Sequence, residues 1–161
     1  MRKLLSALLL AGMFLCMLTG CGSTVPRPEV KEGRFNITVT YEYNGEVKEA
    51  SGVYVCEYDG VNWWDINADP YANWKESYEG DIKDDGIIPI CNTDDGGEIF
   101  ISLLMYPEYF MGDPEHAEST PLVRAEIFYD DRQIDDADVI AEYGVKLIDC
   151  KYDKPIENTY K

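Results

Sequence analysis

The sequence has little of what most catalytic and nucleic-acid-binding sites need. It contains one histidine, His116, among 161 residues, which excludes a Cys₂His₂ zinc finger and a two-histidine zinc site. It has no P-loop, no G-x-G-x-x-G turn and no G-x-S-x-G stretch. Positive charge is also scarce, because 14 Lys and Arg oppose 31 Asp and Glu, for a net charge of −17. Such a surface repels nucleic acid and anionic lipid headgroups, so we expect neither as a direct partner.

Apolar residues are nevertheless plentiful enough for a folded domain. Hydrophobic residues make up 45 % of the chain, with 12 Tyr and 3 Trp, whereas disordered chains have low hydrophobicity. We expect no cofactor and no catalytic residue, and therefore a protein that is not an enzyme. The alternative is a small hydrolase that works through paired carboxylates, because acidic residues are so common here.

The N-terminal segment has the form of a bacterial export signal. Arg2 and Lys3 precede an apolar run from Leu4 to Leu18, which is shorter than the roughly 20 residues that span a bilayer. The four residues that close the segment, Leu18-Thr19-Gly20-Cys21, resemble the lipobox of bacterial lipoproteins. An ordinary cleaved signal and an uncleaved N-terminal anchor are the alternatives.

The lipobox resemblance implies an address and a modification. Residues 1–20 would be a signal peptide, and Cys21 would become the mature N-terminus and carry acyl chains such as palmitate. Two or more acyl chains anchor a protein stably to a bilayer. The protein would then sit on the extracytoplasmic face of the cell membrane. Residues 21–33 would form the lipidated cysteine and a flexible spacer, and residues 34–161 a single β-rich domain.

The first part of that domain predicts a hairpin. Residues from Phe35 to Tyr43 alternate between apolar and polar, as in a half-buried strand. Asn44-Gly45 follows, which is a strong signal for a two-residue hairpin turn. The return strand runs from Glu46 towards Tyr58, with a bulge or bend at Gly52 and a second turn at Asp59-Gly60.

Further strands are expected at Ile87–Cys91, Ile99–Tyr106, Leu122–Tyr129 and Val145–Tyr152, with a short helix over Asp136–Tyr143 and a long loop from Pro107 to Pro121. Roughly seven short strands separated by turns favour an antiparallel β-sandwich. The strand count also fits an immunoglobulin-like sandwich. A small β-barrel is the alternative.

Three cysteines remain after Cys16 and Cys21 are set aside. Cys56 and Cys150 lie on predicted strands and are the pair that we expect to form a disulfide. The alternative is three reduced thiols, including Cys91. The spacing of the three is too wide for a CxxC zinc or redox site.

The three tryptophans lie close together in the sequence and interleave with polar residues. Aromatic rings beside amides and carboxylates can stack on a sugar or bind a protein. The alternative is that part of this segment belongs to the core. The candidate ligand-binding residues are Trp63, Trp64, Tyr71, Trp74 and Tyr78.

The same segment resembles an EF-hand loop. Asp65, Asn67, Asp69 and Glu76 match ligand positions one, three, five and twelve. Pro70 stands where that loop needs a glycine at positive φ, so an Asx-rich turn is the competing interpretation.

These features predict a membrane-anchored extracytoplasmic lipoprotein that binds protein or glycan through the Trp63–Tyr78 segment. A small-molecule or cation-binding accessory subunit of a membrane system is the alternative, besides the hydrolase. The oligomeric state is left open.

Overall fold

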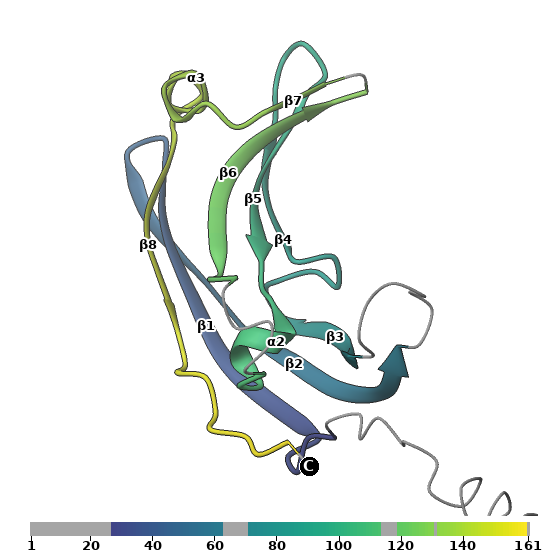
Figure 1. Ribbon diagram of the computed structural model, residues 1–161. Helices are drawn as coiled ribbons and strands as arrows, with labels where there is room; N and C mark the ends of the chain where they lie inside the picture. The colour runs from purple at the N-terminus through teal and green to yellow at the C-terminus, as the bar shows by residue number, and fades with distance from the viewer. Residues whose placement is uncertain (1–26, 63–70, 114–118, 131, 161) are drawn as a thin grey trace, which may run out of the picture.

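The protein folds as two facing β-sheets. The structure is a computed structural model that describes residues 27–62, 71–113, 119–130 and 132–160. Within these ranges, eight strands form two antiparallel sheets, with strand orders β3-β2-β1-β8 and β4-β5-β6-β7 (Figure 1). The predicted β-sandwich is therefore confirmed. The elements are β1 (Glu32–Tyr43), β2 (Glu46–Asn62), β3 (Tyr71–Gly80), β4 (Ile87–Asn92), β5 (Glu98–Leu104), α2 (Pro107–Phe110), β6 (Leu122–Tyr129), β7 (Arg132–Ile134), α3 (Ala137–Glu142) and β8 (Val145–Tyr152).

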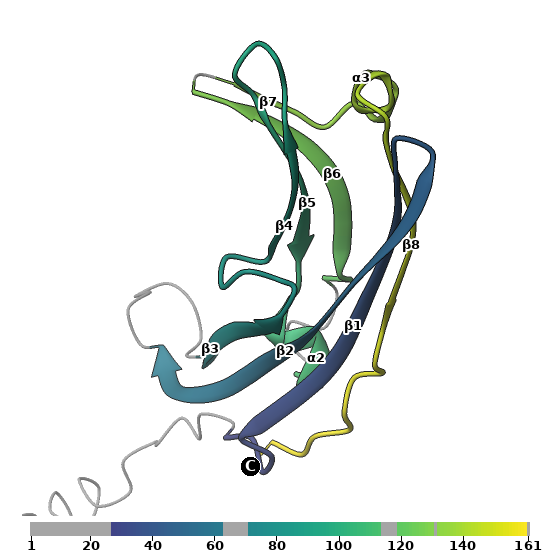
Figure 2. The same ribbon diagram turned by 180° about the vertical axis from the view of Figure 1, so that it is seen from behind.

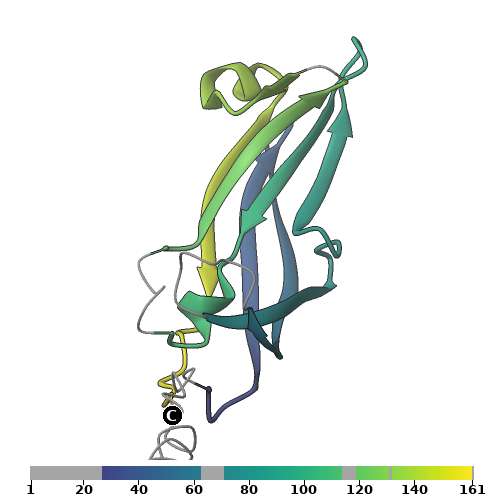
Figure 3. The same ribbon diagram turned by 45° about the vertical axis from the view of Figure 1, so that its right-hand side comes forward.

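The chain follows an up-and-down path that stops short of a barrel. Consecutive strands pair from β1 to β3 and from β4 to β7, and β8 returns to pair with β1. A closed barrel would also need pairing of β3 with β4 and of β7 with β8, and neither occurs among the described strands. The sheet order also differs from that of an immunoglobulin domain, whose sheets mix non-consecutive strands. The β2–β3 end of the first sheet curls past the second sheet (Figures 2 and 3).

The β1–β2 hairpin forms as its sequence predicts. The side chains of Phe35, Ile37 and Val39 are buried, and those between them lie on the other face of β1. Tyr43 pairs with Glu46 across the two-residue turn, where Asn44 and Gly45 have φ values of 53° and 80°. Two positive φ angles characterise a type I′ turn, whose twist matches that of the strands it joins.

An aromatic cluster holds the sheets together. The ring of Phe110, in α2, is fully buried and lies 4.7 Å from the ring of Phe35 and 5.3 Å from that of Tyr54. Residues 107–110 therefore form a helix inside the segment predicted to be one long loop. Pro107 suits a first helical turn, and the buried ring of Phe110 packs the helix against the first sheet.

The buried tyrosines keep a partner for each hydroxyl group. Tyr54 donates to Oε2 of Glu76 at 2.6 Å, and Tyr78 donates to the carbonyl of Leu103 at 3.3 Å. Burial raises the pKa of both tyrosines above its ordinary value. Both therefore stay protonated and serve as hydrogen-bond donors inside the core.

Helix α3 joins the two sheets at the end where β7 and β8 do not pair (Figure 1). The carboxylate of Asp136 caps the helix by accepting two backbone N–H groups of the first turn. Gly144 follows with a φ of 73°, and its carbonyl accepts from the backbone of Asn44 at 2.8 Å. The helix packs through a second buried cluster, made of Ile99, Ile127, Ile140 and Val145.

Strand β3 and the end of β2 differ from the sequence prediction. Tyr71–Gly80 pairs with β2 along its length, which buries Ala72, Trp74 and Tyr78. Asp59-Gly60 is not a turn, because β2 continues to Asn62 with a register shift between Tyr58 and Val61. The structure of this region is determined by the pairing of β3 with β2, and local sequence signals do not indicate that pairing.

The predicted Cys56–Cys150 disulfide is wrong, and the described cysteines are free thiols. On β1, Cys56 faces Gly33 and Cys150 faces Val39. Six residues of strand span about 20 Å, whereas a disulfide needs Cα atoms within about 7 Å. Burial raises the pKa of Cys56 to about 12 and that of Cys150 to about 11, so both are protonated thiols at neutral pH.

The two ends of the described chain are fastened to each other. Oδ1 of Asn158 accepts from the backbone of Val30 at 3.0 Å, and Nδ2 donates to the carbonyl of Val30 at 2.9 Å. Pro28 forms a β-bridge with Tyr160. We call these contacts of residues 28–30 with 158–160 the terminal clasp. The expected flexible spacer is therefore wrong for residues 28–33, which belong to the domain, while 1–26 lie outside the described residues.

Candidate functional site

The outer face of the second sheet carries apolar side chains where a sandwich normally carries polar ones. Strand register places Leu104 opposite Leu122 on this face, and Glu98 opposite Phe128. Leu104, Leu122 and Phe128 are each more than 40 % exposed. Exposed apolar side chains that gather on one face of a sheet mark interaction sites. We define the outer face by the outward residues of β4, β5 and β6, which are Ile87, Pro89, Glu98, Phe100, Ser102, Leu104, Leu122, Arg124, Glu126 and Phe128.

A groove of about 520 Å³ lies over the β4–β5 part of the outer face. Its size is that of a small-ligand or side-chain pocket. Lys83 and Asp85 contribute from the loop between β3 and β4, which runs beside β4 in Figure 1. The polar lining is completed by Asn92 and Glu98, and the apolar lining consists of Ile87, Pro89, Ile90, Cys91, Ile99, Phe100 and Phe128.

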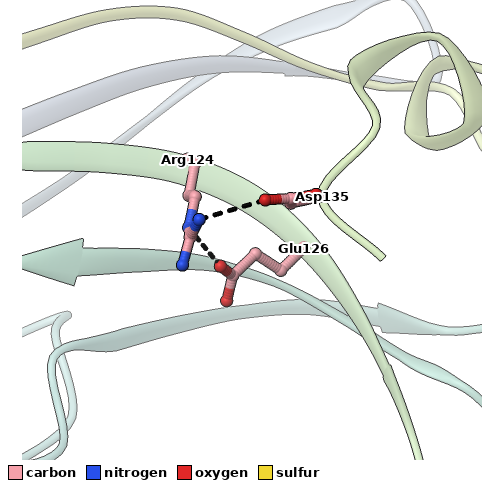
Figure 4. Close-up of polar contacts among 3 residues, drawn as sticks. All are labelled: Arg124, Glu126 and Asp135. Atoms are coloured by element: carbon pink, nitrogen blue, oxygen red, sulfur yellow. Dashed lines mark hydrogen bonds and ion pairs between the residues drawn. The ribbon is translucent and has the colours of Figure 1, made fainter. Parts of the chain in front are cut away.

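An ionic cluster of Arg124, Glu126 and Asp135 lies on the same sheet (Figure 4). Nε of Arg124 contacts Oε1 of Glu126, and Nη1 lies 3.0 Å from Oδ2 of Asp135. Only 4 % of the Glu126 side chain is exposed, against 60 % of that of Asp135. Burying a carboxylate is costly unless a cation accompanies it. Arg124 therefore neutralises a charge that the surrounding side chains keep from water.

We expect Arg124→Leu to lower the free energy of unfolding by about 2 kcal/mol, because Glu126 would stay buried without its cation. Urea denaturation at neutral pH measures this. The double variant Arg124→Leu/Glu126→Leu should recover most of the loss. Asp135→Asn, which removes only the exposed carboxylate, should cost less than about 0.5 kcal/mol. Equal losses for Arg124→Leu and Asp135→Asn would contradict the role given to Arg124.

No family model, curated protein or solved structure matches the chain. In the part of the chain that the structure describes, no helix is long and apolar enough to cross a membrane. The same residues bring together no group of three or more His, Cys, Asp or Glu that could hold a metal ion.

A smaller hollow of about 250 Å³ lies at the β4–β5 turn, between Tyr43 and Tyr143. Asp95 lies there, but its carboxylate already accepts hydrogen bonds from Thr93 at 2.5 Å and from Tyr129 at 3.1 Å. The bond from Thr93 is the main cause that holds the pKa of Asp95 below its usual value. These bonds shape the turn, so the hollow is a weaker candidate than the groove.

The described residues among the aromatic ones proposed from the sequence, Tyr71, Trp74 and Tyr78, do not form a common surface. Trp74 and Tyr78 are buried in the core, so their prediction as ligand-binding residues is wrong. Alternation along β3 turns both side chains towards the second sheet. Tyr71 is half-buried, and its hydroxyl accepts from Asn62 at 2.7 Å. Trp63 and Trp64 lie outside the described residues.

The EF-hand-like match is interrupted by strand β3. Asp65, Asn67 and Asp69 lie outside the described residues, but residues 71–76 are extended strand. The side chain of Glu76, expected at the twelfth position, accepts the hydroxyl hydrogen of Tyr54. The second half of an EF-hand loop leads into a helix, so the predicted calcium role of Glu76 is wrong.

The sequence analysis did not identify the outer face, although β6 carries a signal for it. Leu122 and Phe128 share their face of the strand with Arg124 and Glu126, which breaks the rule of polar residues on the solvent side. The run from Ile99 to Tyr106 is apolar on both faces in the same way. Such runs predict cover on both sides, and among the described helices and strands β5 contacts mainly its sheet neighbours β4 and β6.

Proposed function

We propose that the protein is a lipid-anchored, extracytoplasmic binding module without enzymatic activity, and that it recognises a protein through the outer face. The observation that carries this proposal is the apolar outer face with its groove. Seven of the eleven groove-lining residues are apolar. An apolar lining favours the side chains of a protein over the hydroxyl groups of a glycan.

The anchoring part of the proposal rests on the Leu18-Thr19-Gly20-Cys21 motif. The fold is compatible with it, because β1 begins at the end of the molecule where the terminal clasp lies (Figure 1). The turn between β1 and β2 and helix α3 lie at the opposite end. A chain tethered through Cys21 would hold that opposite end away from the membrane.

Photo-crosslinking in the native host tests the binding role. A photoreactive phenylalanine analogue at position 128 should yield a discrete adduct with one protein. The same analogue at position 47, where Val47 is 65 % exposed on the first sheet, is the matched control and should not. In the purified complex, Phe128→Ser should weaken binding at least about 10-fold, because truncating one buried anchor costs more than about 1.4 kcal/mol. Adducts that are the same at both positions, or that contain only glycan, would refute the proposal.

A further inference from the structure

We infer that the occupant of the outer face is a basic segment of a protein, with an apolar side chain that enters the groove and cationic side chains that meet the surrounding carboxylates. This inference rests on the proposed function and specifies its partner. It comes from the charges around the apolar surface and from the way in which the edge of the sheet is closed.

Carboxylates outnumber cations around the groove and the ionic cluster. Asp85 and Glu98 line the groove with Lys83. Glu126 and Asp135 share the single guanidinium of Arg124. The site therefore carries four carboxylates against two cations, within a chain whose net charge is −17. An acidic partner would meet repulsion throughout, whereas a basic partner is attracted at long range and paired at contact.

The ionic cluster offers one negative charge that no described side chain neutralises completely. Arg124 compensates one of its two carboxylates, and Asp135 keeps 60 % of its side chain in solvent. Phe100 lies opposite Glu126, and Phe128 is two residues further along β6. A partner would pair its cation with Asp135, which directly follows β7, and place its apolar side chain in the groove, which reaches β6 at Phe128. Aromatic anchors surrounded by complementary charge are typical of specific interfaces.

The edge of the second sheet is less suited to the partner than its face. In the described residues β4 pairs only with β5, so its other edge faces outward. Pro89 has no N–H to donate, and a register shift follows between Pro89 and Cys91. The carbonyl of Ile87 is already used by the backbone of Lys83 at 2.9 Å. These features oppose addition of a partner strand, so recognition falls to the side chains of the outer face.

Fluorescence anisotropy with two labelled peptides tests the inference on the full chain held in zwitterionic lipid nanodiscs, with empty nanodiscs as blank. One heptapeptide alternates Lys with Leu and Phe, and the other replaces each Lys by Glu. We expect the Lys peptide to bind and the Glu peptide not to bind. Phe128→Ser should weaken binding of the Lys peptide at least 10-fold, and Val47→Ser should weaken it less than 2-fold. Raising the salt concentration should also weaken binding of the Lys peptide, because exposed charges are screened.

A charge-matched pair of double variants decides the electrostatic part. Glu98→Gln/Asp135→Asn removes two carboxylates from the site, and Glu49→Gln/Asp149→Asn removes two from the first sheet. We expect at least 10-fold weaker binding for the first and less than 2-fold for the second. Equal weakening would show attraction by net charge alone and would overturn the inference. Loss of binding in Phe128→Ser without loss in Glu98→Gln/Asp135→Asn would also overturn it, while leaving the proposed function intact. A chain that dimerises through Phe128, or that ignores both peptides, would overturn it too.

Discussion

Phe110→Ala is expected to lower the free energy of unfolding by about 3–5 kcal/mol, the largest effect of any single truncation considered. The ring is fully buried and lies 4.7 Å from Phe35 and 5.5 Å from Tyr152. It therefore contacts both β1 and β8 from a helix of four residues. Removing the ring leaves a cavity. The neighbouring strands cannot move in to close it, because β1 is held by its pairing with both β2 and β8. Urea denaturation followed by tryptophan fluorescence measures the loss.

Two control variants distinguish the loss of core packing at Phe110 from the loss of a phenylalanine ring elsewhere. Phe110→Leu keeps most of the apolar volume and should cost less than about 1.5 kcal/mol. Phe128→Ala removes a ring that is 49 % exposed on the outer face and should cost less than about 1 kcal/mol. If Phe110→Ala cost no more than Phe128→Ala, α2 would not be part of the stabilising core.

Gly52→Ala is expected to cost about 3 kcal/mol, because the added methyl group meets backbone rather than a side chain that can move. A Cβ atom at Gly52 would lie 2.4 Å from the carbonyl oxygen of Glu79 and 2.8 Å from Cδ1 of Ile82. The residue opposite is Gly80, where a Cβ atom would lie 2.6 Å from the carbonyl oxygen of Ser51. Strands β2 and β3 thus approach closely at a pair of glycines. Thermal and urea unfolding of the variant test this.

Gly60→Ala is the matched control, since Gly60 lies in the same strand with a φ of 91° but with nothing near its missing Cβ. Only backbone strain should arise there, at about 1 kcal/mol. A larger loss at Gly60 than at Gly52 would contradict the close approach of the strands. The strand register also shows that the bulge expected at Gly52 is absent, because Gly52 pairs in register with Ile37 on one side and with Gly80 on the other.

Local sequence signals predicted an element correctly where its hydrophobic period and the turn residues at its ends indicated the same structure. The β1–β2 turn was predictable because Asn44-Gly45 follows an alternating strand, and β6 and β8 have the bounds that their alternation predicts. Strand β3 was not, because the polar Glu76 interrupts the row of apolar residues formed by Ala72, Trp74 and Tyr78. Its pairing with β2 compensates for that weak propensity. The false disulfide has the same origin, since the register of β1 with two neighbours cannot be read from either cysteine.

The candidate site was harder to predict than the fold. The mixture of Phe128 and Arg124 on one face of β6 signals an unusual strand, but the sequence pattern does not show which of its two faces meets the core. That distinction requires knowing which face of the second sheet meets the first. The tryptophans attracted attention because they cluster in sequence, yet Trp74 packs edge-to-face on Tyr58, 5.7 Å between ring centroids, and belongs to the core.

The position of β1 has a mechanical consequence. β1 is an inner strand that pairs with β2 along its whole length and with β8 from Ile37 to Tyr43. A pull on the N-terminal end of the domain runs along β1, and ladder hydrogen bonds lie across the strand direction. Such a load shears many bonds at once instead of peeling them one by one. The few hydrogen bonds between Val30 and Asn158 would break first. The paired strands of the sandwich would then resist the load together.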